Sequence, residues 1–152
     1  MSDARARGGP GVDTAFDPGQ MKIGRKLAID YFKTIKPHKV FVSEHYRAAL
    51  ILTLETPKGG VGIPHLDKFA VSDDAQGEGL GRAAWQVMRA DTPQLFWRSR
   101  ADNPINEFYF DEADGCLKGE QWNVFWYGLE SFDDIRFAVD HCRARPASLI
   151  GP

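Results

Sequence analysis

The sequence predicts one mixed α/β domain in which a largely antiparallel sheet is flanked by helices. Short β-rich runs separated by turn residues indicate the sheet. Apolar residues at helical spacing from Leu80 to Met88 indicate an amphipathic helix over residues 80–91. A glycine-rich turn at residues 76–81 joins a strand over residues 66–71 to that helix, which predicts a strand, loop and helix unit.

The remaining elements follow from local patterns along the chain. Residues 1–20 have no periodicity and many helix breakers, so we expect an arm or linker remnant, followed by one domain over residues 21–152. In that domain we expect a first helix from Met21 to Lys36, a hairpin of residues 40–42 and 48–54, a loop over 57–62, a strand over 95–100, a helix starting at Asn103-Pro104, an apolar run over 122–127, and a last helix capped by Ser131.

Composition excludes several classes of protein. The 152 residues carry a net charge of −2 and a pI near 6.1, which argues against a general nucleic-acid binder. No apolar run is long enough to span a membrane, so we expect a soluble cytoplasmic protein. Cys116 and Cys142 lack the spacing of a zinc site or a disulfide framework, and no metal is expected. Cys142 is most simply a buried apolar residue.

The glycine-rich turn suits a phosphate, because glycines allow close approach and the first helical turn presents N–H groups. Arg82-Ala83 does not supply the Lys and Ser or Thr of a P-loop, and the G-x-G-x-G spacing differs from a dinucleotide fingerprint. A glycine-rich helix start with no ligand remains open as the structural alternative.

Alternation along residues 95–100 places Arg98 and Arg100 on one face of their strand. Lys68 adds a third cation just before the apolar residues 69–71. Structural ion pairs with Asp67, Asp73, Asp74 or Glu107 are one explanation. For the set we favour an acidic substrate, since guanidinium groups bind carboxylates through two parallel hydrogen bonds.

Several blocks together resemble the acetyltransferase (GNAT) domain of N-acetylglutamate synthase, of the vertebrate-like and bacterial bifunctional type, over about residues 21–145. These blocks are the loop of residues 76–81, the run Leu95-Phe96-Trp97-Arg98-Ser99-Arg100, Asn103-Pro104-Ile105-Asn106, Phe108-Tyr109-Phe110, Gln121-Trp122 and residues 125–129. The resemblance implies the GNAT fold and the transfer of an acetyl group from acetyl-CoA to the α-amino group of L-glutamate.

The resemblance also implies roles for individual residues. Tyr109 and Asn103 match the catalytic tyrosine and asparagine of the family, with Tyr109 as candidate proton or hydrogen-bond donor to the leaving thiolate. The residues implied in glutamate binding are Arg98, Arg100, Lys68, Phe69 and, from the first helix, Arg25 or Lys26. Those implied in coenzyme A binding are Ala70, Val71, Gln76, Gly77, Glu78, Gly79, Leu80, Gly81 and Arg82.

Other possibilities stay open at this point. Tyr109 could simply pack in an aromatic core, and Asn103 could simply cap a helix. We assign no catalytic role to His38, His45, His65 or His141. The chain could also be a GNAT enzyme for another amine, or a non-catalytic acetyl-CoA-binding module. The family normally carries an upstream amino-acid-kinase domain, so such a partner domain is expected in the native protein, while a homo-oligomer stays open.

Overall fold

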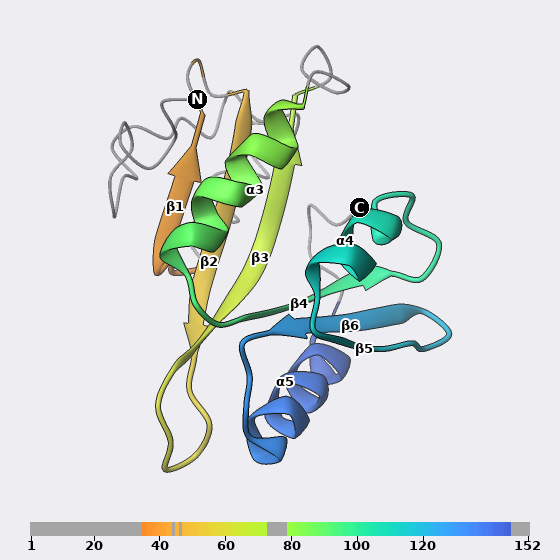
Figure 1. Ribbon diagram of the computed structural model, residues 1–152. Helices are drawn as coiled ribbons and strands as arrows, with labels where there is room; N and C mark the ends of the chain where they lie inside the picture. The colour runs from red at the N-terminus through yellow and green to blue at the C-terminus, as the bar shows by residue number, and fades with distance from the viewer. Residues whose placement is uncertain (1–34, 44, 46, 73–78, 147–152) are drawn as a thin grey trace. The chain divides into compact units, whose positions relative to one another are not determined.

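The computed structural model describes residues 35–43, 45, 47–72 and 79–146 (Figure 1). Most of the expected first helix, with Arg25 and Lys26, lies outside the described residues, as do Gln76, Gly77 and Glu78, and its expected last residues, Ile35 and Lys36, are not helical. The elements in the described part are β1 (Lys39–Val42), β2 (Ala48–Glu55), β3 (Ile63–Val71), α3 (Leu80–Asp91), β4 (Leu95–Arg100), α4 (Asn106–Glu112), β5 (Gly115–Leu117), β6 (Trp122–Tyr127) and α5 (Phe132–Ala144).

These strands form a mixed sheet, which confirms the predicted fold class. Their hydrogen-bonded order is β1-β2-β3-β4-β6-β5. β3 and β4 pair in parallel, with His65 opposite Phe96, whereas the β1–β2, β4–β6 and β5–β6 pairs are antiparallel. The contacts divide the chain into a first unit (residues 1–54 and 66–92) and a second unit (residues 55–65 and 93–152), each described by itself below.

The first unit contains the predicted hairpin of β1 and β2. Val40 lies opposite Ile51 in this hairpin, and both side chains are buried. The Ser43 hydroxyl accepts a hydrogen bond from the Ala48 backbone N–H at 2.8 Å, which closes the connection between the strands. The predicted hairpin is therefore confirmed.

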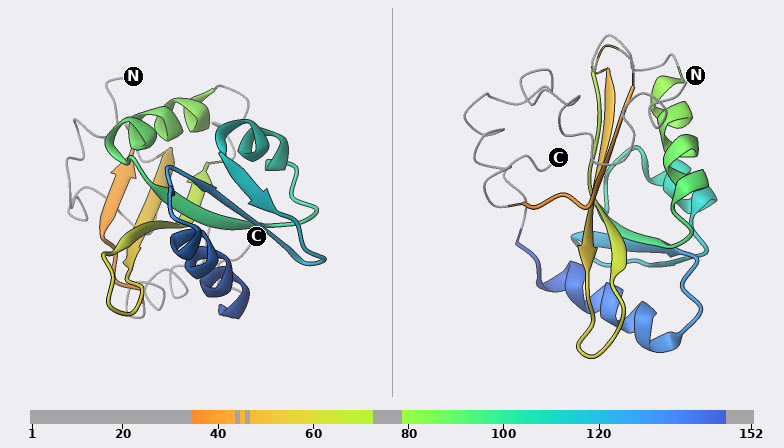
Figure 2. Two further views of the ribbon diagram at one scale, coloured as in Figure 1. Left: turned by 60° about the horizontal axis from the view of Figure 1, so that its bottom comes forward. Right: turned by 90° about the vertical axis from the view of Figure 1, so that its left-hand side faces the viewer.

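Helix α3 has the boundaries that its apolar periodicity predicts. Ala84, Trp85 and Met88 are buried, and Figure 2 shows the helix lying along one face of β1, β2 and β3. Near its C-terminal end, Asp91 accepts a hydrogen bond from Lys39 at 3.0 Å. Burial of the Trp85 ring and its neighbours supplies most of the stabilisation of this helix, since packing outweighs propensity in short helices.

The second unit is built on the antiparallel pair β4 and β6, with α4 and α5 on opposite sides of it (Figure 1). The α5 side holds the core cluster of Ile63, Phe96, Val124, Leu129, Ala138 and Cys142. Ser131 caps α5 as predicted, because its hydroxyl accepts a hydrogen bond from the Asp134 N–H at 3.1 Å. Cys142 is a buried core residue, as expected, and burial raises the pKa of its thiol to about 12.

Two strands and one helix differ clearly from expectation. β3 begins at Ile63 rather than near Leu66, and β5 was not predicted at all. Helix α4 begins at Asn106 instead of directly after Asn103. The reason is that Asn103 accepts a hydrogen bond from the Ile105 N–H and so closes a separate turn before the helix. No helix among the described residues has the length and apolarity needed to cross a membrane.

Candidate active site

The N-terminus of α3 is the described part of the predicted coenzyme A loop. Gly79 precedes the helix with φ 79° and ψ 1°, the left-handed conformation that glycine adopts without strain. The helix has neither a side-chain cap nor an acidic residue in its first turn. Its positive end therefore meets no negative side chain from its own first turn, an arrangement that favours an anionic ligand.

Gly81 has a different reason to be glycine. A Cβ atom at this position would lie 2.9 Å from a methyl carbon of Val71 and 3.6 Å from the ring of Phe69. The first turn of α3 thus packs directly onto β3, and a side chain here would require the Val71 side chain to shift. Packing of the helix on the strand is enough to explain Gly81 without any ligand. Gly79, in contrast, is explained by its left-handed backbone conformation.

The predicted contacts on β3 lie in the first unit. Lys68, Phe69, Ala70 and Val71 are all half-buried near the C-terminal end of the strand. The Phe69 ring packs against Trp85 with the ring centroids 5.8 Å apart. Phe69 therefore joins β3 to the buried face of α3, while Leu80 and Arg82 occupy the first turn of that helix.

Arg98, in the second unit, is bound to the end of α5. Its Nη1 donates to the carbonyls of Cys142 at 2.8 Å and Arg145 at 2.7 Å, and its Nη2 donates to the carbonyl of Pro146 at 2.7 Å. A cation at this end of a helix is stabilised by both the carbonyls and the helix dipole. A substrate that binds the Nη atoms of Arg98 must therefore compete with these three carbonyls. A contact through Nε of Arg98 would avoid that competition.

Trp122 joins the two predicted substrate arginines. The guanidinium carbon of Arg98 lies 3.7 Å from the indole centroid, and that of Arg100 lies 4.9 Å from it. Arg100 and Trp122 are directly opposite each other in the β4–β6 register, which explains the contact. Stacking on one indole holds two positive groups together on the α5 face of β4.

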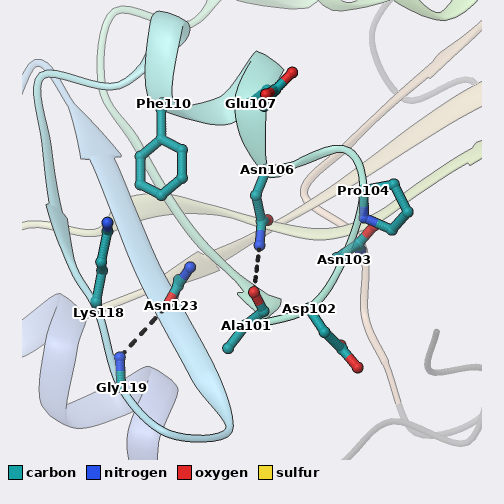
Figure 3. Close-up of a pocket in the computed structure, with 10 residues that line it drawn as sticks. All are labelled: Ala101, Asp102, Asn103, Pro104, Asn106, Glu107, Phe110, Lys118, Gly119 and Asn123. Carbon is teal, nitrogen blue, oxygen red and sulfur yellow. Dashed lines mark hydrogen bonds between the residues drawn. The ribbon is translucent and has the colours of Figure 1, made fainter.

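The loop after β4 holds Asn103 in place. Its backbone N–H donates to the carbonyl of Arg100 at 3.0 Å, and its own carbonyl accepts from the Asn106 N–H at 3.0 Å. The buried Asn106 amide donates to the carbonyls of Arg100 at 2.9 Å and Ala101 at 3.3 Å. Asn103 and Asn106 line an open pocket of about 470 Å³, which Lys118 and Asn123 border on the opposite side (Figure 3).

Tyr109 is buried in an aromatic cluster on the α4 face of β4, with 6% of its surface exposed. Its ring centroid lies 5.4 Å from those of Trp97 and Phe125. Burial raises the pKa of Tyr109 well above the usual value for a phenol, because the charged form would lose its solvation. The side chain therefore stays protonated and suits hydrogen-bond donation better than loss of its proton.

The structure brings some of the predicted residues together and separates others. Within the second unit, Arg98 and Arg100 meet on Trp122, and Asn103 follows them in the adjoining loop. Tyr109 contacts Trp97, whose side chain lies on the opposite face of β4 from Arg98. No role for Trp122 or Asn106 follows from the sequence alone. Strand pairing of residues 95–100 with 122–127 is the signal that would have identified Trp122.

Comparison with known proteins gives one decisive match. The family described as "NAT, N-acetyltransferase, of N-acetylglutamate synthase" matches residues 18–145. The chain belongs to this family. The resemblance stated from the sequence is thereby confirmed.

Curated relatives support the same assignment to the NAT family. The chain is 57% identical over 132 residues to "Acetylglutamate kinase" of Xanthomonas campestris pv. campestris, covering 87% of this chain and 31% of that protein. It is 45% identical over 131 residues to human "N-acetylglutamate synthase, mitochondrial", covering 85% of this chain and 24% of that protein. The chain thus spans about a third or less of the length of these relatives.

A solved acetyltransferase from Thermus thermophilus is also similar in structure. It aligns with a TM-score of 0.47 at 20% identity, covering 64% of this chain and 67% of that one.

Proposed function

We propose that this chain transfers an acetyl group from acetyl-CoA to the α-amino group of L-glutamate, a step of arginine biosynthesis. The observation that carries the proposal is the match of residues 18–145 to the acetyltransferase family of N-acetylglutamate synthase. Arg98 and Arg100, stacked on one indole, supply the positive charge that an acidic acceptor needs.

In the first unit, the proposal assigns coenzyme A to the start of α3. The left-handed Gly79 and the uncapped first turn are features that fit the pyrophosphate group. The backbone of Ala70 and Val71 would bind the pantetheine arm, and Leu80, Gly81 and Arg82 would present their N–H groups to the phosphates. The proposed contacts from Gln76, Gly77 and Glu78 lie outside the described residues.

In the second unit, the proposal assigns the glutamate carboxylates to the arginine pair. Arg100 is given the more direct contact, because the Nη atoms of Arg98 already donate to three carbonyls. Arg98 adds positive charge and holds the indole against which Arg100 is placed. The family resemblance also implies acceptor contacts from Lys68 and Phe69, which lie in the first unit, and from Arg25 or Lys26, which lie outside the described residues.

The proposed chemistry is direct transfer through a ternary complex. The neutral amine of glutamate attacks the thioester carbonyl, the tetrahedral intermediate collapses, and the thiolate of coenzyme A leaves. Tyr109 donates a hydrogen bond to that sulfur, and its burial keeps the phenol protonated while this happens. Asn103 orients the acceptor or a water that takes the proton of the amine.

Two other functions are distinguished by the same residues. An acetyltransferase for a polyamine would use acidic groups to bind its acceptor, in contrast to the arginine pair on Trp122. A non-catalytic acetyl-CoA-binding module would keep the start of α3 but would not need the buried phenol of Tyr109. The proposal extends to the native protein: an amino-acid-kinase domain preceding this one, a possible homo-oligomer, and a cytoplasmic location.

The deciding experiment measures coenzyme A release from acetyl-CoA by the purified chain. L-Glutamate is compared with glutamine, aspartate, lysine, spermidine and a short peptide, and the Arg100→Ala variant serves as the matched control. The proposal expects turnover selective for glutamate that Arg100→Ala weakens. Turnover with spermidine or a peptide in preference to glutamate would replace the proposed acceptor, and acetyl-CoA binding without any turnover would favour the binding module.

A further inference from the structure

Three side chains with metal-ligating atoms converge in the second unit. They are Glu55 at the end of β2, His65 near the start of β3 and His141 in the last turns of α5. One ligand atom from each lies within 4.8 Å of those of the other two. Nε2 of His141 is 3.8 Å from Oε1 of Glu55, and the two imidazole centroids are 5.4 Å apart.

Aromatic packing fixes the orientation of both imidazoles. The His65 ring lies 4.9 Å from the ring of Phe96, and the His141 ring lies 5.7 Å from Phe96 and 5.8 Å from Phe137. Phe96 belongs to the core of this unit, so the two histidines are held by a rigid element. Rigid support of ligands lowers the ordering cost of binding an ion.

The three side chains form a recognised ligand set. A neutral imidazole is the form that binds metal ions. Nδ1 of His65 faces Nη1 of Arg145 at 3.3 Å, and because a guanidinium only donates, this nitrogen accepts. Glu55 adds the negative charge, and two imidazoles with one carboxylate form a ligand set typical of Zn²⁺, Co²⁺ and Fe²⁺.

We propose that Glu55, His65 and His141 bind one divalent transition-metal ion such as Zn²⁺. From the sequence no metal is expected, because Cys116 and Cys142 lack the spacing of a zinc site. Glu55, His65 and His141 are far apart in the chain, so no local motif points to them. The fold brings them together through the return of β3 after the loop of residues 56–62 and through the packing of α5. Three protein ligands leave at least one position for water or an anion.

The ligand atoms of the three side chains lie somewhat farther apart than they would around a bound ion. Bond lengths near 2.1 Å and tetrahedral angles bring ligand atoms to about 3.4 Å from one another. The separation of 3.8 Å between His141 and Glu55 is close to this value, and both side chains are partly exposed, so small rotations of them complete the site. His65, which is buried, supplies the fixed ligand.

Arg145 competes with the metal ion for His65. Its Nη1 lies 3.3 Å from Nδ1 of His65, where it donates to the lone pair that a metal ion would need. Metal binding therefore displaces the guanidinium, and its charge together with that of Arg98 weakens the affinity. This competition gives the site a distinctive property: removal of the Arg145 side chain strengthens metal binding.

The test is calorimetric titration of the untagged chain with Zn²⁺, paired with visible absorption of the Co²⁺ form. The wild type is expected to bind one equivalent, and the Co²⁺ spectrum should show nitrogen and oxygen ligands at low coordination number. His141→Ala should weaken Zn²⁺ binding by about tenfold or more, and Arg145→Gln should tighten it. The exposed His38 lies outside the cluster, so His38→Ala is the matched control and should leave the affinity unchanged.

Two results would overturn the proposal. One is the absence of Zn²⁺ binding in both the wild type and Arg145→Gln; the other is equal affinity in the wild type and His141→Ala. Circular dichroism of each variant establishes that the fold is retained, and Glu55→Gln provides a second, more conservative ligand change. Neither titration depends on acetyl transfer, so failure of the proposed enzymatic function leaves this inference intact, and the reverse also holds.

Discussion

The two faces of strand β4 carry opposite kinds of chemistry. On the α4 face, Trp97 packs against Tyr109 and Phe125 in a buried aromatic cluster. On the α5 face, Arg98 and Arg100 stack on Trp122, which is only half-buried. Alternation along β4 thus places Trp97, which contacts the buried Tyr109 of α4, on one face and the arginine pair on the other. The difference teaches that a single strand can border a buried aromatic environment and a positively charged surface at adjacent residues.

The α4 face should control the rate of transfer. For Tyr109→Phe we expect kcat to fall by about 100-fold or more, since a positioned acid contributes on that order, with little change in the glutamate KM. Steady-state kinetics measure both constants. Tyr127→Phe is the matched control, because it removes another buried hydroxyl whose ring lies 6.1 Å from that of Trp97. An unchanged kcat in Tyr109→Phe would remove Tyr109 as the donor.

The α5 face should control affinity for the acidic acceptor. For Arg100→Ala we expect the glutamate KM to rise by about tenfold or more, because a charge-assisted hydrogen bond is lost. Arg98→Ala should raise the KM strongly as well. Acetyl-CoA binding, measured by calorimetry, should change little in either variant. If either variant lost acetyl-CoA binding along with glutamate affinity, the arginine would not act on glutamate alone.

Arg98 and Arg100 should differ in stability. Arg98→Ala leaves three carbonyls at the end of α5 without their donor, so we expect a loss of about 1–3 kcal/mol in the free energy of unfolding. Arg100→Ala should cost less than this. Urea unfolding of the two variants measures the difference, and equal losses would show that the carbonyl contacts of Arg98 do not hold the helix end.

Trp122 should act through the arginine pair. Trp122→Leu removes the stacking surface, and a cation–π contact of about 0.5–2 kcal/mol corresponds to a several-fold rise in the glutamate KM. The kcat should be less affected, and Trp122→Phe should recover part of the loss because it keeps an aromatic face. If Trp122→Leu and Trp122→Phe raise the glutamate KM equally, the aromatic face of Trp122 does not contribute to the arginine pair.

The α4 face also predicts a pH dependence of stability. The folded pKa of Tyr109 is raised above the unfolded value of about 10, so the folded protein keeps its proton at a pH where the unfolded chain has lost it. This contribution is fully present below pH 10 and is lost above it, at up to about 1.4 kcal/mol per pH unit. Alkaline unfolding should be less steep in Tyr109→Phe than in the wild type, and identical curves would contradict the assignment.

The sequence predicted most of the regular elements because their patterns are local. Strands β4 and β6 and helix α3 have the predicted boundaries, since each follows from periodicity and adjacent turn residues. The short β5 was missed because a three-residue strand has no readable alternation. The start of α4 was misplaced because a separate turn closed by Asn103 and a true N-cap use the same residue types.

The candidate site was predicted in part. Strand alternation placed Arg98 and Arg100 on one face, as observed, but could not show that the end of α5 provides carbonyls for Arg98. Trp122 acquires its role only through pairing with Arg100, which is a contact between distant parts of the chain. The cluster of Glu55, His65 and His141 likewise depends on three elements whose meeting no local pattern encodes.

Gly81 has a consequence for how such sequences evolve. A glycine that is required because α3 packs on Val71 stays under selection for folding even where a lineage has lost the use of its cofactor. Descendants of this domain that no longer catalyse anything would therefore retain part of the glycine signature. Retention of Gly81 alone indicates only that the contact between α3 and β3 is kept. Loss of the residues at positions 98, 100 and 109 is the better sign that a paralogue no longer catalyses the reaction.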